Sequence, residues 1–149
     1  MTRSAEFDAR CSRARAGSSK EIGLKPALRR ALLIVEKMTK AEGIILGSPV
    51  YFTDVTAEMK ALIDRAGFVS MANGGMYKNK VGAVVVAVRR SGAIHTLDTM
   101  SHFFLAGQMI IIGRGIGVGR DKGEVEKDEE GMQSVKALGQ RMAWLLKKL

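Results

Sequence analysis

Two short segments carry the residue types that could bind a ligand in this chain. The first, residues 48–53, reads Ser-Pro-Val-Tyr-Phe-Thr, and the second, residues 89–92, reads Arg-Arg-Ser-Gly. Each directly follows an apolar run, as expected of a loop at the end of a buried strand. Small residues, two aromatic rings and open backbone amides in such a loop suit a flat heteroaromatic ligand.

The candidate binding residues are Ser48, Pro49, Val50, Tyr51, Phe52, Thr53, Arg89, Arg90, Ser91 and Gly92. The guanidinium groups of the second segment suit a phosphate or another anion. An alternative is that Tyr51 and Phe52 only close the hydrophobic core and that the two arginines are solvated. His95 and His102 are expected at the surface, and with the distant Cys11 they make no zinc site. No side chain is expected to act as a catalytic nucleophile.

The hydrophobic pattern around these segments predicts an α/β protein. Strands are expected at residues 43–47, 80–88 and 109–113, and helices at residues 27–40, 55–67, 96–106 and 127–148. Thr96 is the expected N-cap of the third helix. The glycine-rich stretch after residue 113 reads as a loop, because its spacing does not give a dinucleotide-binding fingerprint. The alternation of helices and strands predicts a parallel sheet covered on both faces.

A turn motif and a helix motif at fixed spacing link the first segment to a known family. Residues 47–52 read Gly-Ser-Pro-Val-Tyr-Phe and residues 59–65 read Met-Lys-Ala-Leu-Ile-Asp-Arg. This pair resembles the flavodoxin-fold NADPH-dependent FMN reductase family, most closely its iron–sulfur flavoprotein-like branch. The resemblance extends from about Ala31 to Leu149. It implies a flavodoxin-like three-layer sandwich with a parallel sheet.

The resemblance also implies a function and a site. FMN would be the cofactor and NAD(P)H the co-substrate, with a hydride passing to flavin N5 and electrons then passing to a quinone, a free flavin or a protein. Residues 48–53 would contact the isoalloxazine ring. Residues 89–92 would lie over its pyrimidine edge, where a cation stabilises the reduced flavin. The family's members often form dimers or tetramers, so a homo-oligomer is expected.

The first thirty residues depart from the family's pattern. The opening two strands and the phosphate-binding loop between a strand and a helix are missing, and so are the closely spaced cysteines of the iron–sulfur branch. The sequence therefore predicts no iron–sulfur cluster. It predicts a flexible basic arm at residues 1–25 and a partial flavodoxin-like domain at residues 26–149. A non-catalytic remnant, serving as a subunit or an interaction module, is the alternative function.

Composition narrows the possible functions and the possible location of the protein. The formal charge is +9, and the single cysteine, Cys11, excludes a disulfide within one chain. Residues 1–30 contribute +5 of this charge, which raises nucleic-acid binding as a third possibility, although no aromatic-interleaved basic motif supports it. No apolar run reaches the ~20 residues that a membrane span needs. These features predict a cytoplasmic protein.

Overall fold

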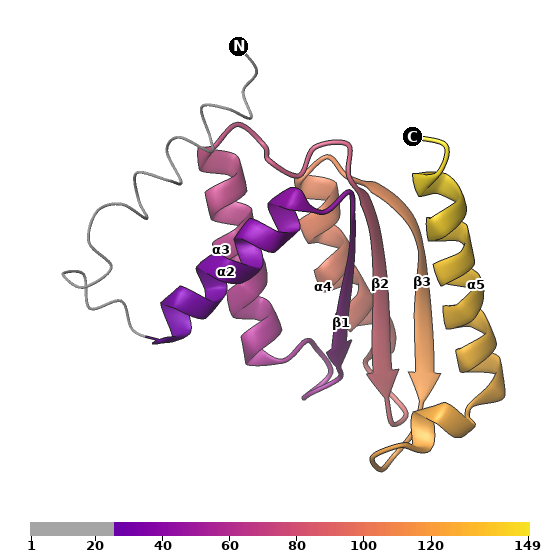
Figure 1. The fold of residues 1–149 in the computed structure, drawn as a ribbon. Helices are drawn as coiled ribbons and strands as arrows, with labels where there is room; N and C mark the ends of the chain where they lie inside the picture. Colours follow the sequence, from indigo (N-terminus) through magenta and orange to yellow (C-terminus); the bar gives the residue numbers. More distant parts are fainter. Residues whose placement is uncertain (1–25) are drawn as a thin grey trace. The chain divides into compact units, whose positions relative to one another are not determined.

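The computed structural model describes residues 26–149, and the order of its elements alternates helix and strand as predicted (Figure 1). Residues 34–149 form one compact unit, which begins within the first described helix. The elements are α2 (Pro26–Lys40), β1 (Gly43–Pro49), α3 (Ala57–Ala72), β2 (Val81–Val88), α4 (Ala93–Ala106), β3 (Ile110–Val118), the 3₁₀ helix η1 (Glu124–Lys127) and α5 (Glu129–Leu146). The expected arm at residues 1–25 lies outside the described residues.

Three parallel strands form the sheet, in the order β1-β2-β3. The β1–β2 register runs from Gly43↔Val81 to Pro49↔Ala87. The β2–β3 register is irregular between Gly82 and Val84, opposite Gly113 of β3, whose φ is +153°. A parallel sheet needs a crossover between each pair of strands, and α3 and α4 provide the two crossovers here.

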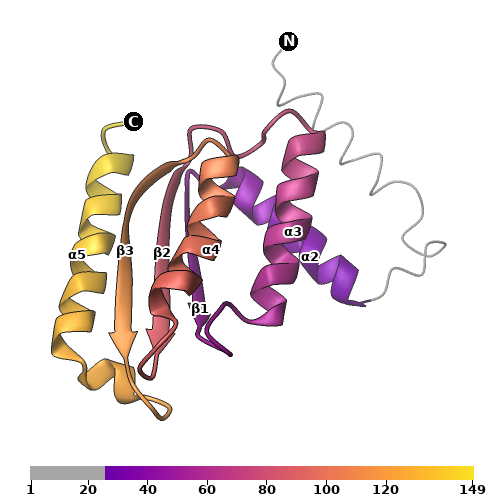
Figure 2. The ribbon, with the colours of Figure 1, turned by 180° about the vertical axis from the view of Figure 1, so that it is seen from behind.

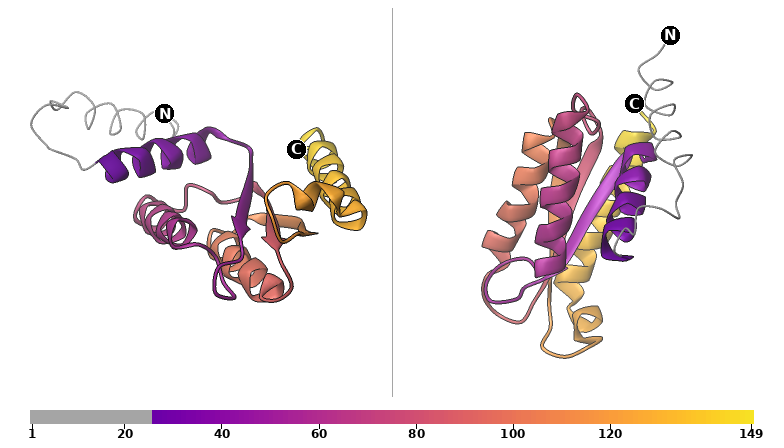
Figure 3. Two further views of the ribbon diagram at one scale, coloured as in Figure 1. Left: turned by 90° about the horizontal axis from the view of Figure 1, so that it is seen from below. Right: turned by 90° about the vertical axis from the view of Figure 1, so that its left-hand side faces the viewer.

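Helices cover both faces of this sheet. Helices α3 and α4 lie on one face and α5 on the other (Figures 2 and 3). The α3/α4 face of the core holds the side chains of Val35, Met38, Ile44, Leu46, Val84, Val86, Val88, Leu97, Met100 and Phe104. The α5 face holds those of Val81, Ala83, Leu138 and Met142. Strand β2 is thus buried from both sides, which explains its near-continuous run of valine and alanine.

Strand β3 is longer than the sequence predicted. It continues to Val118 instead of ending at Gly113, so the first half of the presumed glycine-rich loop is strand. The glycines serve close packing, because a Cβ on Gly115 would lie 2.7 Å from Val135 Cγ2 of α5. A Cβ on Gly117 would collide with Val125 of η1. Glycine in a strand often marks such a close approach.

Helix α4 begins earlier than predicted. Its N-cap is Gly92, and Thr96 lies inside the helix instead of capping it. The Thr96 side chain is fully buried, and its hydroxyl donates to the carbonyl of Gly92 at 2.9 Å. This hydroxyl therefore bonds to the preceding turn of its own helix.

Strand β1 has a free edge within residues 26–149. Only β2 pairs with β1 there, and Ile45 in the middle of β1 has 52% of its surface exposed. An edge strand of this kind presents unpaired backbone groups to potential partners. No helix in this part of the chain combines the length and the apolar character that crossing a membrane requires.

Candidate functional site at the carboxyl ends of the strands

The loop after β1 presents two aromatic side chains to solvent. Tyr51 and Asp54 close a tight turn, with Tyr51 N–H donating to the Asp54 carbonyl at 2.9 Å and Asp54 N–H donating to the Tyr51 carbonyl at 3.2 Å. The central residues Phe52 and Thr53 have φ values of 51° and 71°. Phe52 is fully exposed and Tyr51 is 64% exposed. Neither ring closes the core, so the alternative for Tyr51 and Phe52 is wrong.

Buried hydrogen bonds fix the base of this loop. The hydroxyl of Ser48, which is buried, donates to the Pro49 carbonyl at 2.8 Å and accepts from Thr56 N–H at 3.2 Å. Val50 N–H donates to the carbonyl of Ala87 in β2 at 2.9 Å. Thr56 then caps α3 by accepting from the Met59 N–H. The turn therefore projects from a well-anchored base.

The loop after β2 contacts the loop after β1 through backbone. Gly92 has a φ of +88°, and a Cβ there would lie 2.6 Å from Thr53 Cα and 2.9 Å from Val50 Cγ1. No residue that carries a Cβ fits this position without strain. Arg89, Arg90 and Ser91 are exposed, and neither arginine has an ion pair with any residue in 26–149.

The structure thus gathers the ten predicted residues at one edge of the sheet, with Ser48 and Pro49 at the end of β1 and the others on the loops that follow β1 and β2. They meet because the carboxyl ends of neighbouring parallel strands lie at one edge of a sheet.

The sequence did not predict that side chains of α4 also contact the loop after β1. The Asp54 Oδ1 atom accepts hydrogen bonds from Val55 N–H at 2.7 Å and from the Thr99 hydroxyl at 2.8 Å. His95 Nε2 lies 3.5 Å from Oδ2 of the same carboxylate.

The surroundings of Asp54 favour its ionised form. Partial burial works against the charge, but hydrogen bonds from Val55 and Thr99 outweigh it, together with the nearby charges of His95 and Lys60. The net effect is a pKa for Asp54 below its usual range. The one sequence signal for the contact between Asp54 and α4 was the position of this acidic residue, next to the predicted loop and two positions before the Thr56 N-cap.

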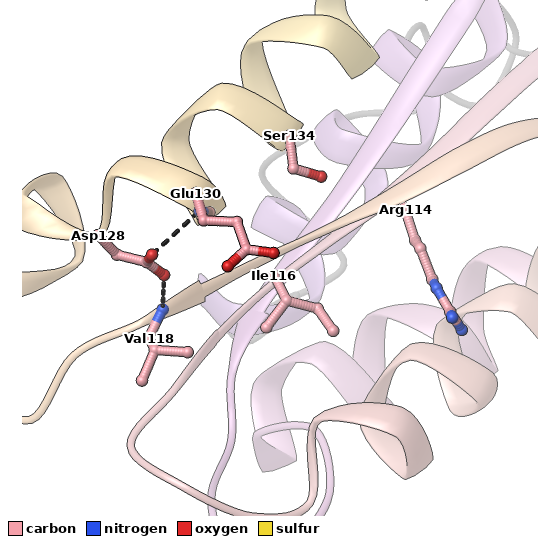
Figure 4. A pocket seen from close by; sticks show the side chains of 7 residues that line it. Arg114, Ile116, Val118, Asp128, Glu130 and Ser134 are labelled. Carbon is pink, nitrogen blue, oxygen red and sulfur yellow. Dashed lines mark hydrogen bonds between the residues drawn. The ribbon is translucent and has the colours of Figure 1, made fainter.

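A separate groove of about 340 Å³ lies along the free edge of β3 (Figure 4). Its lining residues are Arg114, Ile116, Val118, Asp128, Glu130, Gly131 and Ser134. The Asp128 carboxylate accepts from Val118 N–H at 2.7 Å and from Gly131 N–H at 3.0 Å, so it fastens the end of β3 to the start of α5. These hydrogen bonds lower the pKa of Asp128. Two carboxylates make this groove a poor place for a phosphate group.

The two loops suit the ring of a flavin. The exposed Tyr51 and Phe52 offer apolar and aromatic surface, and Gly92 lets the backbone of one loop reach the other without an intervening side chain. Arg89 and Arg90 supply positive charge beside them. Within residues 26–149 the loops that follow β1 and β2 hold these groups, and neither has the form of the family's phosphate-binding loop.

Comparisons with known proteins show which family the chain resembles. The profile of the NADPH-dependent FMN reductase family matches residues 18–123. This match begins before Ala31, so the expected start of the resemblance was too late. Iron–sulfur flavoprotein MJ1083 of Methanocaldococcus jannaschii is 37% identical over 138 residues, covering 86% of this chain and 70% of that protein. An iron–sulfur flavoprotein of Methanosarcina thermophila is 34% identical over 116 residues, covering 76% of this chain and 60% of that protein.

Solved structures show the same fold at low sequence identity. The Trp repressor binding protein of Bacillus subtilis superposes with a TM-score of 0.63 at 17% identity, covering 69% of this chain and 66% of that one. A flavodoxin, WrbA-like protein of Agrobacterium tumefaciens gives a TM-score of 0.53 at 14% identity, covering 71% of each chain. The fold is therefore flavodoxin-like, and the matching profile and relatives show that the chain belongs to the NADPH-dependent FMN reductase family.

Proposed function

We propose that this chain binds FMN at the loops after β1 and β2 and acts as an NAD(P)H-dependent oxidoreductase. The observation that carries the proposal is the exposed turn with Tyr51 and Phe52, in backbone contact with Gly92 and next to Arg89 and Arg90. Family membership supports a flavin-binding oxidoreductase in general terms. When bound, FMN supplies two-electron chemistry, taking a hydride from NAD(P)H at N5 and passing electrons to a quinone, flavin or protein acceptor.

The residues would bind and orient the ring and would not react with it. Tyr51 and Phe52 would shield it from water, and backbone N–H groups of residues 48–53 would donate to its polar edge. Arg89 and Arg90 would favour negative charge on the ring, or would meet the phosphate of NADPH.

We further propose that the chain carries no iron–sulfur cluster of its own. Several relatives are named iron–sulfur flavoproteins, but such clusters are held by several cysteine thiolates. This chain has only Cys11, which lies outside the described residues. Analysis of iron and acid-labile sulfide in the purified protein tests the proposal, since a stoichiometric content of both would contradict it.

Homo-oligomerisation is a third part of the proposal. The exposed Ile45 and the unpaired edge of β1 support it. A cytoplasmic location is compatible with an FMN-dependent oxidoreductase and stays a prediction.

The alternative is a non-catalytic subunit that has kept the fold without the cofactor. The chain spans 60% of the M. thermophila protein and 64% of a second M. jannaschii iron–sulfur flavoprotein. The loop that holds the FMN phosphate in the family has no counterpart between residues 26 and 149.

Titration of the purified full chain with FMN, followed by flavin fluorescence, separates the two functions. Stoichiometric binding supports the oxidoreductase, and NADPH and NADH oxidation assays then identify the preferred nucleotide. Phe52→Ala is expected to weaken binding, whereas Phe68→Ala, which removes an exposed ring from α3, is the matched control. A folded protein that takes up no FMN contradicts the proposal and favours the non-catalytic subunit.

A further inference from the structure

The turn at residues 51–54 needs support from outside itself. Phe52 and Thr53 both have positive φ, a conformation that bulky and β-branched residues rarely adopt. Such residues persist only where the surrounding structure holds them in place. Two backbone hydrogen bonds between Tyr51 and Asp54 close the turn, but they leave its orientation on the sheet undetermined.

The Asp54 carboxylate supplies a link from this turn to a different element. Its Oδ1 atom accepts from the Thr99 hydroxyl of α4 at 2.8 Å, across 45 positions of sequence. The same atom accepts from Val55 N–H at 2.7 Å, which fixes the carboxylate relative to its own backbone. His95, also on α4, lies 3.5 Å from Oδ2. One side chain therefore joins the loop after β1 to the first turns of α4.

The position of Asp54 separates this role from ligand contact. Asp54 follows the two exposed rings, and its carboxylate is directed to α4, where Thr99 Oγ1 and His95 Nε2 lie. Gly92 gives the turn a second contact, because its missing side chain lets Thr53 approach. The turn is thus held by a close backbone contact and by a charged acceptor.

We infer that Asp54, through its hydrogen bond with Thr99, is the positioning residue that orients the Tyr51–Phe52 turn for ligand binding. The inference rests on the proposed function, since the ligand in question is the flavin ring. Asp54 acts on that ring only through the turn that it holds. Thr99 is its partner, and His95 reinforces the pair when protonated.

Variants that separate shape from hydrogen bonding test this role. Asp54→Ala removes the acceptor, and Thr99→Val removes only the donated hydrogen bond while keeping the shape. Thr99→Ser restores the hydroxyl. Asp98→Ala is the matched control, because it removes an exposed carboxylate from α4, the helix that carries Thr99.

The readouts are the FMN dissociation constant and the absorption and fluorescence spectra of bound flavin, measured on the full chain. Asp54→Ala is expected to weaken FMN binding about ten- to a hundredfold, the range for loss of charge-assisted hydrogen bonds, and to change the spectra. Thr99→Val is expected to act in the same direction, with Thr99→Ser and Asp98→Ala close to the parent protein. Parent-like affinity and spectra for both Asp54→Ala and Thr99→Val overturn the inference.

Amide hydrogen exchange of the ligand-free protein decides the inference if the parent protein binds no FMN. In that case the proposed function fails, and the positioning of the turn is still measurable. Faster exchange at residues 51–55 in Asp54→Ala than in Asp98→Ala supports the role of Asp54 in holding the turn. Equal exchange in both variants contradicts it.

Discussion

Thr53 occupies a backbone conformation that β-branched residues rarely adopt, with a φ of 71°. Glycine reaches this region without steric cost. Thr53→Gly is therefore expected to raise the free energy of unfolding by about 1 kcal/mol, because the relief of strain exceeds the entropy that glycine adds to the unfolded chain. Urea denaturation measures this change.

The neighbouring Thr56 provides the contrast for that experiment. Its hydroxyl accepts from Met59 N–H at the start of α3, so Thr56→Ala is expected to lower the free energy of unfolding by about 1 kcal/mol. A loss of stability in both variants would mean that the Thr53 side chain contributes contacts that outweigh its strained backbone.

Tyr77 makes the stability of the protein sensitive to alkaline pH. Its side chain is fully buried against Phe103, with ring centroids 5.7 Å apart. Burial raises the pKa of Tyr77 to about 12. Because this pKa lies above the unfolded value of about 10, the contribution of Tyr77 is complete below pH 10. It is lost as the pH rises from about 10 to about 12, at a cost of about 2 kcal/mol.

Chemical denaturation at a series of pH values checks this effect. Tyr77→Phe removes the titrating hydroxyl and keeps the ring, so its free energy of unfolding is expected to fall less steeply between pH 10 and 12. Parallel curves for the parent protein and the variant would show that another group controls the alkaline transition.

At the scale of elements, glycines set how closely α5 and η1 approach β3. Gly115 faces Val135, where a Cβ would be 2.7 Å from a methyl group, while Gly139 on the same helix has open space around it. Gly115→Ala is expected to cost about 1–3 kcal/mol through overpacking. Gly139→Ala is expected to add about 0.5–1 kcal/mol through better helix propensity.

Thermal unfolding of the two variants compares the same chemical change in two settings. Opposite shifts in Tm support close packing between β3 and α5 as the reason for the glycines. A neutral Gly115→Ala would mean that α5 can move away from the sheet at little cost.

The elements also show which parts of the fold the sequence could predict. The apolar runs of β1 and β2 identify them as strands, and the site loops follow because they come directly after these strands. Only β2 is buried along its length, since alternate residues of β1 are exposed. The second half of β3 was missed because alternating glycines read as a turn until the helix packed against them is known. The contact between Asp54 and Thr99 spans two elements, and no local pattern predicts such a tertiary hydrogen bond.

At the scale of the whole molecule, the two edges of the sheet differ. Strand β3 has its end fastened by Asp128 and its glycines packed against α5 and η1, whereas β1 exposes Ile45 in the middle of the strand. If copies of the chain associate, we expect the β1 edge to be the interface. Lysine on an edge strand opposes such pairing.

Sedimentation velocity over a range of concentrations tests the interface. Ile45→Lys is expected to shift the protein toward the monomer, and Ile110→Lys, at an exposed position of β3, is expected to leave the distribution unchanged. A monomeric parent protein contradicts the proposal of a homo-oligomer, and an effect of Ile110→Lys alone would place the interface at β3.

The register of the sheet also has a consequence for how the chain reaches its native state. Gly43 pairs with Val81, and Val81 pairs with Ile110, so every strand pair joins residues separated by an entire helix. Within residues 26–149 no hairpin can form early and serve as a template, because both ladders there are parallel. Each ladder requires closure of a long loop before any backbone hydrogen bond compensates, which slows folding. Refolding from urea is therefore expected to be slower than for helical bundles of similar length.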